Sequence, residues 1–272
     1  MPDLRAVKRS VLLYFALVPA AWGQATWGQL DPNDIVRKSI ENCERDWRAS
    51  MSWAWTQTDI SMADYKKEVT VSEMVPLGGT PFERVIKKDG RPLTPEEQRK
   101  EDRKFERALN QRENEPASER EARIRKYENE RAFIKDIPGA YSFSLLGEEN
   151  IDGRAAWLIQ MTPRAGFVPT AAHAALLEHF EGKLWIDKED LQWIKADARA
   201  IHTVSIGWIV ARIGPGAHFT FEQTRVANGL WMPKRLTVAG LVRVMMVYGK
   251  SLNEEVLYSG YHLEKQLQAG TH

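Results

Sequence analysis

Cysteine is nearly absent from this 272-residue chain, which contains only Cys43. A single thiol cannot form an intramolecular disulfide, so a disulfide framework is excluded and the fold has to depend on packing. An excess of charge of one sign is also absent, because 38 Lys and Arg residues stand against 37 Asp and Glu residues. No overall field favours nucleic acid, and we predict no nucleic-acid partner.

Motifs for catalysis and metal binding are missing as well. The six histidines include no pair spaced four residues apart, as a helical zinc site requires, and neither a Gly-x-Ser-x-Gly elbow nor a phosphate-binding loop occurs. His173 and His179 come nearest to a cluster, but they would lie about 240° apart around a helix. The sequence therefore predicts no enzyme, no cofactor and no metal site.

Long apolar runs are absent beyond the first 25 residues. Arg5, Lys8 and Arg9 precede the apolar run 11–18, and small residues follow up to Gly23. This order is typical of a secretory signal peptide, residues 1–23, with cleavage before Gln24. The run is shorter than the ~20 residues of a bilayer span, so we expect no transmembrane span. We expect a periplasmic or secreted protein whose mature part, 24–272, is one domain; an uncleaved N-terminal anchor is the alternative.

Tryptophan, in contrast, is abundant, with ten residues that together offer a large apolar surface. At the start of the mature chain, Asp31 and Pro32 are a good helix start, and Val36, Ile40, Cys43 and Trp47 follow at helical spacing on one face. The sequence predicts an amphipathic helix with Cys43 buried in the core.

A charged insertion follows at about residues 94–136. Between Glu96 and Lys135, 40 positions contain 12 basic and 11 acidic residues, so the signs of charge are mixed. Thr94 and Glu97 form a capping box, Pro116 interrupts the stretch, and Ser118 with Glu121 suggests a second box. This pattern predicts a charged helical hairpin, either as a solvated cover resting on a sheet or as a surface for a protein partner.

Beyond Pro138 the chain reads as strands joined by tight turns. Asp152-Gly153 and Asn228-Gly229 favour two-residue hairpin turns, and such consecutive strands form a meander. The segment GKLWIDKEDLQWIKADA, 182–198, contains four carboxylates, of which Asp187, Glu189 and Asp190 fall between two strands. We interpret them as solvated turn residues and not as the facing, differently tuned pair that a glycosidase needs.

Two groups of residues are candidates for a ligand site. Alternation along the strand 192–201 predicts that one face of it is concave and is formed by Ile194, Ala196, Ala198 and Ala200. The three alanine side chains are small, so they leave room for a ligand or for a closely packed helix. The short segment 167–182 predicts a lid over the mouth, with a surface loop as the alternative; its inward residues are Ala174, Leu177 and Phe180.

Three stretches of this part resemble the LolA/LolB-like carriers, the outer-membrane lipoprotein-sorting superfamily of the cell envelope. They are GEENIDGRAAWLIQMTPRAG, GKLWIDKEDLQWIKADA and FEQTRVANGLWMPKRL. The resemblance implies a mainly β fold with α-helices: an antiparallel meander curved into an open half-barrel, with helices on its concave side. The charged insertion is longer than the plug helices expected of such a carrier.

The resemblance also implies a function. It suggests a non-catalytic carrier or chaperone that holds the acyl chain of a lipoprotein or of another envelope lipid in the half-barrel. The alternative is an envelope sensor or scaffold that binds another protein through the charged hairpin.

Overall fold

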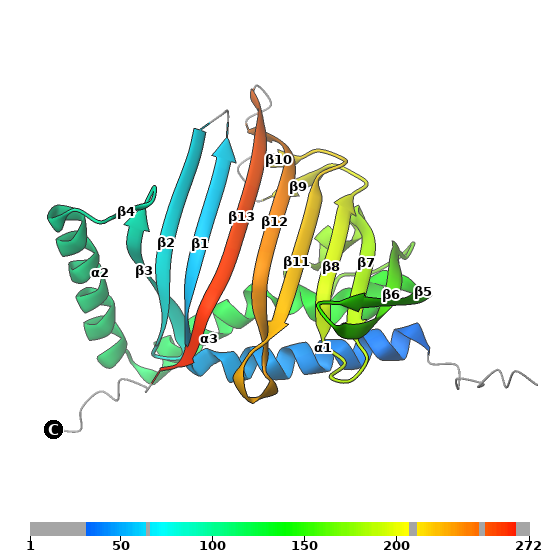
Figure 1. Ribbon diagram of the computed structural model, residues 1–272, viewed down its shortest axis with the longest axis horizontal. Helices are drawn as coiled ribbons and strands as arrows, with labels where there is room; N and C mark the ends of the chain where they lie inside the picture. The colour runs from blue at the N-terminus through cyan, green and yellow to red at the C-terminus, as the bar shows by residue number, and fades with distance from the viewer. Residues whose placement is uncertain (1–30, 64–65, 207–210, 245–247, 265–272) are drawn as a thin grey trace, which may run out of the picture. The chain divides into compact units, whose positions relative to one another are not determined.

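In the computed structural model, one antiparallel sheet of thirteen strands organises the described part of the chain (Figure 1). The structure describes residues 31–63, 66–206, 211–244 and 248–264. The predicted signal peptide and its cleavage point before Gln24 lie outside the described residues. The strands are β1 Trp53–Ala63, β2 Lys66–Leu77, β3 Thr80–Lys88, β4 Arg91–Pro92, β5 Tyr141–Ile151, β6 Arg154–Pro163, β7 Phe180–Asp187, β8 Trp193–Ala200, β9 Val204–Ile206, β10 Ala211–Ile213, β11 His218–Arg225, β12 Trp231–Val244 and β13 Tyr248–Leu263.

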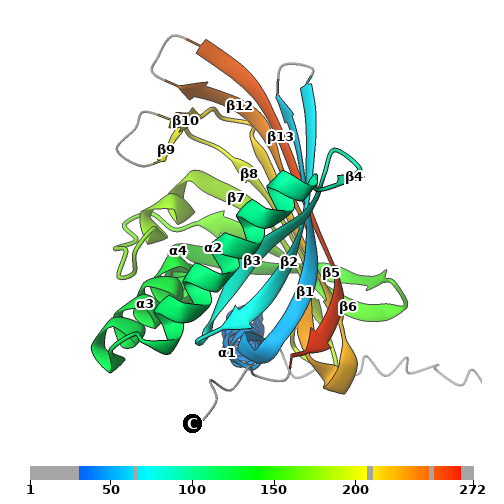
Figure 2. The same cartoon turned by 90° about the vertical axis from the view of Figure 1, so that its left-hand side faces the viewer.

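The order of the strands leaves the sheet open. Eleven strands follow the path β4-β3-β2-β1-β13-β12-β11-β8-β7-β6-β5, and β9 and β10 extend it at β12. The last strand, β13, lies between β1 and β12 and so joins two meanders into one sheet. Figure 2 shows this sheet curving with the helices on its concave side, which confirms the predicted open half-barrel.

The first helix, α1 Pro32–Ala49, runs along the concave side and contacts β5, β7 and β12. The Asp31 side chain accepts a hydrogen bond from the Asn33 amide at 2.9 Å, and proline follows at the first turn, as predicted. Its buried face is Ile35, Val36, Ser39, Ile40, Cys43 and Asp46. The prediction that Cys43 is a buried core residue is confirmed.

The main core lies between this helix and the strands β5 to β8. Short elements complete it, namely η1 Ser50–Ser52, η2 Ala132–Asp136, α4 Ile137–Ala140, η3 Ala174–His179 and η4 Ala227–Gly229. The Tyr141 hydroxyl donates to the Leu177 carbonyl at 2.8 Å, which ties η3 to β5. The buried cluster includes Ile35, Val36, Ile40, Ile137, Tyr141, Ile159, Leu177, Leu184, Ile186 and Trp193.

The charged insertion forms two helices, as predicted, α2 Pro95–Glu113 and α3 Ala117–Glu130. The Thr94 capping box is present, with Thr94 and Glu97 exchanging both hydrogen bonds. Phe105 of α2 lies against Phe82 of β3, with ring centroids 5.6 Å apart. This contact places α2 along the outer end of the sheet (Figure 1).

Two local predictions are wrong, one in the insertion and one in the connection between β11 and β12. The second capping box does not form, because α3 already begins at Ala117 with Pro116 as its N-cap, so Ser118 is inside the helix. The connection around Asn228-Gly229 is also not a two-residue turn. The strands end at Arg225 and begin again at Trp231, and η4 fills the gap with a bond from the Val226 amide to the Leu230 carbonyl.

Candidate ligand cavity

A cavity of about 450 Å³ lies between the concave face of the sheet and the helices. We name it the aromatic cavity, because nine of its lining residues are aromatic. Its volume is within the range of small-molecule sites, roughly 300 to 1,000 Å³. The lining residues are Cys43, Trp47, Ser50, Trp55, Gln57, Met74, Pro81, Tyr127, Arg131, Phe133, Ile134, Trp193, Phe221, Gln223, Trp231, Met232, Pro233, Tyr258 and Tyr261.

The sheet wall of this cavity is assembled from strands that are far apart in sequence. Trp55 of β1 pairs with Met74 of β2, and Gln57 of β1 pairs with Tyr258 of β13. Paired residues in an antiparallel sheet point to the same face, and residues two apart on a strand do so too. Pairing of β1 with both neighbours therefore places all four side chains on the concave face.

The helical wall is held together by stacked rings. Trp47 of α1 and Tyr127 of α3 stack with centroids 5.6 Å apart, and the Arg131 guanidinium lies 4.5 Å from the centre of the Trp47 ring. Arg131 also forms an ion pair with Glu44 of α1, with 3.4 Å between Nε and Oε1. These contacts join α1 to the end of α3 and form the wall of the cavity that lies opposite the sheet.

The cavity is nearly neutral at physiological pH. Burial raises the pKa of Cys43 to about 12, and burial with the nearby Asp59 raises the pKa of Tyr258 to about 12. Both groups therefore stay protonated. Arg131, the charged group of the lining, is compensated by Glu44. Such a site favours an apolar ligand, because transferring a charge into it would cost solvation.

Three polar side-chain atoms of the lining are buried without a hydrogen bond in the described part of the chain, and one of them, Arg131 Nε, has an ion-pair partner in Glu44. The indole nitrogen of Trp55, a donor, and the amide oxygen of Gln223, an acceptor, are buried and form no hydrogen bond within the described residues. An unpaired buried polar group costs about 1 to 3 kcal/mol. A ligand with one hydrogen-bonding group near these atoms would recover part of that cost.

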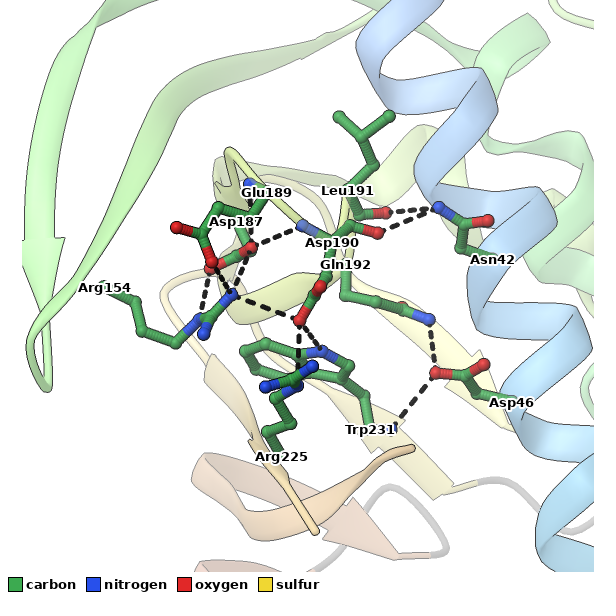
Figure 3. A network of polar contacts seen from close by, with 10 residues as sticks. All are labelled: Asn42, Asp46, Arg154, Asp187, Glu189, Asp190, Leu191, Gln192, Arg225 and Trp231. Atoms are coloured by element: carbon green, nitrogen blue, oxygen red, sulfur yellow. Dashed lines mark hydrogen bonds and ion pairs between the residues drawn. The ribbon is translucent and has the colours of Figure 1, made fainter. Parts of the chain in front are cut away.

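The carboxylates of the loop between β7 and β8 form the polar network drawn in Figure 3. Asp187 accepts hydrogen bonds from Arg154 at 2.5 and 2.8 Å and from the amides of Glu189 and Asp190 at 3.0 and 2.7 Å. The prediction of solvated turn carboxylates is correct for Glu189, whose side chain is 82% exposed, and wrong for Asp187, which is 1% exposed. Fixed in this way by Arg154, Asp187 has a structural role in the hairpin.

The same network holds Trp231 (Figure 3), which is one of the residues that line the aromatic cavity. Asp190 accepts from the Trp231 indole nitrogen at 2.9 Å, and the buried Asp46 of α1 accepts from the Trp231 amide at 3.1 Å. Asp46 also accepts from Gln192 at 2.6 Å, while Asn42 donates to the Asp190 and Leu191 carbonyls at 3.0 and 3.1 Å. Helix, loop and Trp231 are thereby held in one arrangement.

The cavity candidates on β8 are not all on one face. The pairing of β7 with β8 shifts by one residue between Trp185 and Ile186, so that Trp185 pairs with Lys195 and Ile186 pairs with Trp193. Ile194 is the extra residue of this irregularity and packs with Trp185 and Trp231 in a separate buried cluster. The predicted grouping of Ile194 with the alanines is therefore wrong.

The alanines keep their alternation beyond this point. Ala196 joins the main core beside Trp193, and Ala200 packs against Ala217. Ala198 is half-buried and pairs with Gly182. The residues of β8 and β11 that line the aromatic cavity are Trp193, Phe221 and Gln223, so the alanines lie beside this cavity and not in its wall.

The lid candidates lie in or next to η3. Ala174 and Leu177 are buried in the main core, and Phe180 starts β7 and packs near Ala200. None of the three lines the aromatic cavity. A lid function for them stays a prediction.

Sequence reasoning missed the aromatic residues that form the cavity. The abundance of tryptophan indicated a large apolar surface, but it did not say which rings gather. Strand alternation places Trp55 and Gln57 on one face, which was the available signal. Within the described residues, no group of three His, Cys, Asp or Glu side chains is placed to hold a metal ion. None of the helices described is long and apolar enough to cross a membrane.

Solved structures of other proteins are similar to this chain. No protein-family model and no curated protein matches the sequence. A LolA superfamily protein from Nitrosomonas europaea is 12% identical, with 86% of this chain and 94% of that chain covered and a TM-score of 0.32. An outer membrane lipoprotein-sorting protein domain from Vibrio parahaemolyticus is 12% identical, with 86% and 95% covered and a TM-score of 0.35.

A third solved structure is the complex of MucA and MucB from Pseudomonas aeruginosa, which matches at 11% identity over 84% of this chain and 99% of that chain, with a TM-score of 0.23. The descriptions of the first two structures carry the family name to which the three sequence stretches bear a resemblance. At these identities and TM-scores, the function of this chain has to be inferred from its own residues.

Proposed function

We propose that this protein is an exported, non-catalytic carrier or chaperone that holds the acyl chain of a lipoprotein or of another envelope lipid in the aromatic cavity. The observation that carries the proposal is the cavity itself, which has a volume of about 450 Å³ and is lined by nine aromatic residues. The charge of its lining residue Arg131 is compensated by the ion pair with Glu44. Each methylene removed from water contributes about 0.8 kcal/mol, so about ten of them contribute about 8 kcal/mol. A chain bound in this way would stay with the protein during purification.

Retention of lipid tests the proposal. Tyr258→Arg and Met74→Arg each place a charge in the sheet wall, and we expect both variants to purify with at most a tenth of the lipid of the wild type. The matched control is Leu257→Arg, because Leu257 is adjacent to Tyr258 on β13 and is exposed on the other face. The measurement is mass spectrometry of organic extracts, with circular dichroism to show that each variant is folded.

Two outcomes of this experiment are decisive. Lipid lost from both wall variants and kept by Leu257→Arg supports an acyl chain in the aromatic cavity. Equal lipid content in all four folded proteins, or no lipid in the wild type, overturns the proposal.

Export is a separate expectation from the sequence. The basic and apolar segments before Gly23 predict a mature protein that begins at Gln24 or within a few residues of it. Intact-mass measurement on protein from the cell envelope checks this directly. Retention of Met1 would contradict cleavage and favour an N-terminal anchor.

A further inference from the structure

A second cavity, of about 580 Å³, lies where the end of α1 meets the β2–β3 turn and both helices of the charged insertion. We name it the arginine pocket. Its apolar floor includes Leu77, which is 4% exposed, and the side chains of Leu109 and Ile124. The lining residues are Arg48, Ala49, Met51, Ser52, Pro76, Leu77, Gly78, Gly79, Leu109, Arg112, Glu113, Arg120 and Ile124.

The charge of this pocket is positive. The lining contains three arginines, Arg48, Arg112 and Arg120, and one carboxylate, the exposed Glu113. The charges of Arg112 and Arg120 also act on Glu115, which is paired with Arg123. None of the three arginines forms an ion pair with a carboxylate of the described residues. The neighbouring Arg123 differs, because it is paired with Glu115 at 2.6 Å.

Arg112 is held in place by neutral acceptors. Its Nη1 donates to the Leu77 carbonyl at 2.6 Å and to the Thr80 hydroxyl at 2.8 Å. Burial, and then the positive charge of Arg123, lower the pKa of Arg112, and they outweigh the nearby Glu115, whose charge acts in the opposite direction. The guanidinium is therefore fixed by the β2–β3 turn and forms no ion pair with a carboxylate of the described residues.

The arginine pocket adjoins the aromatic cavity. Along one face of α3 and its C-cap residue Arg131, Arg120 and Ile124 line the pocket, and Tyr127 and Arg131 line the cavity. Ile124 and Tyr127 are three residues apart, or about 4.5 Å along a helix axis. On α1, Trp47 lines the aromatic cavity and Arg48 lines the arginine pocket. On β2, Met74 lines the cavity and Pro76 lines the pocket.

We infer that the occupant of the two spaces is a single-chain lipid with an anionic head, whose chain fills the aromatic cavity and whose head binds in the arginine pocket. This inference rests on the proposed function and specifies the class of its ligand. Carboxylate and phosphate heads share the required chemistry, because a guanidinium binds the oxygens of either in a bidentate manner.

The test compares lipids that share one chain and differ in the head. Calorimetric titration of the full, delipidated protein at pH 8 uses a fatty acid, the fatty alcohol of equal length and a single-chain phosphomonoester lipid, with inorganic phosphate alone as a fourth probe. We expect the wild type to bind at least one anionic lipid about tenfold or more tightly than the alcohol.

The variant is Arg48→Gln with Arg120→Gln, because both side chains are exposed and Arg112 is needed for the β2–β3 turn. It should lose the preference for the anionic lipid and keep the affinity for the alcohol. The matched control, Arg99→Gln with Lys126→Gln, removes the same charge from exposed positions outside the pocket and should keep the preference.

The outcomes separate this inference from the proposed function. Equal binding of acid, phosphomonoester and alcohol overturns the anionic head and leaves an acyl carrier in place. Loss of preference in both double variants shows only a long-range effect of charge and also overturns it. Phosphate alone bound through Arg48 and Arg120, without preference among the lipids, identifies a free-anion site instead. Failure of every lipid to bind refutes the proposed function itself.

Discussion

Replacing Asp187 with asparagine is expected to lower the free energy of unfolding by about 3 kcal/mol, the cost of removing one partner from a buried ion pair. Asp187 is 1% exposed, and its oxygens accept from Arg154 and from two loop amides. An amide group would present hydrogens to the Arg154 guanidinium in place of one oxygen. The remaining contacts of Arg154 with Glu189 and Asp190 keep the loss from being larger.

The pH dependence gives this prediction a second observable. Burial by itself would raise the pKa of Asp187, but the hydrogen bonds from Arg154 and the Asp190 amide outweigh it and hold the pKa below its ordinary value. A carboxyl with a lowered pKa stabilises the fold above its unfolded pKa, about 4, and this contribution disappears as the pH falls through the folded value. The wild type should lose more stability below pH 4 than Asp187→Asn does.

Glu189→Gln is the matched control, because Glu189 contacts the same arginine at 3.2 Å but is 82% exposed. We expect it to change the free energy of unfolding by less than about 1 kcal/mol. Urea unfolding at pH 7 and at pH 3.5 measures both effects. Similar losses in the two variants would mean that Asp187 is not the buried anchor of the loop.

Local signals in the sequence predicted much of the fold. Asp152 and Gly153 have φ values of 51° and 86°, which two-residue hairpin turns require and which this dipeptide favours. The Thr94 capping box likewise depends on residues three apart and forms as predicted. Such features need no information about distant parts of the chain.

The features that sequence reasoning missed depend on distant partners. Asp187 can be buried because it is paired with Arg154, which is 33 residues away in the sequence. The irregularity at Ile194 arises from the register in which β8 pairs with β7. The cavity depends on β13 pairing with β1, which brings Tyr258 opposite Gln57. Alternation along one strand gives its two faces, but only the pairing decides which side chains meet.

The environment of Gly182 is also decided by strand pairing. Replacing Gly182 with alanine is expected to lower the free energy of unfolding by about 3 kcal/mol, in the upper part of the range for overpacking. Gly182 pairs with Ala198 between β7 and β8. A Cβ atom at this position would be 2.1 Å from the Asp197 carbonyl oxygen and 2.8 Å from the Ala198 Cα. These are backbone atoms of a paired strand, so no side-chain rotation can relieve the contact.

Gly139→Ala is the control for this prediction, because a Cβ there would meet the Phe167 ring at an ordinary 3.8 Å. We expect that change to be within about 1 kcal/mol of the wild type, since alanine also restricts the unfolded chain. Urea unfolding of both variants gives the comparison, and hydrogen exchange of β7 and β8 amides should localise the effect. If Gly182→Ala unfolds like Gly139→Ala, the two strands can separate without loss, and β8 does not depend on β7 to hold Trp193 in the cavity wall.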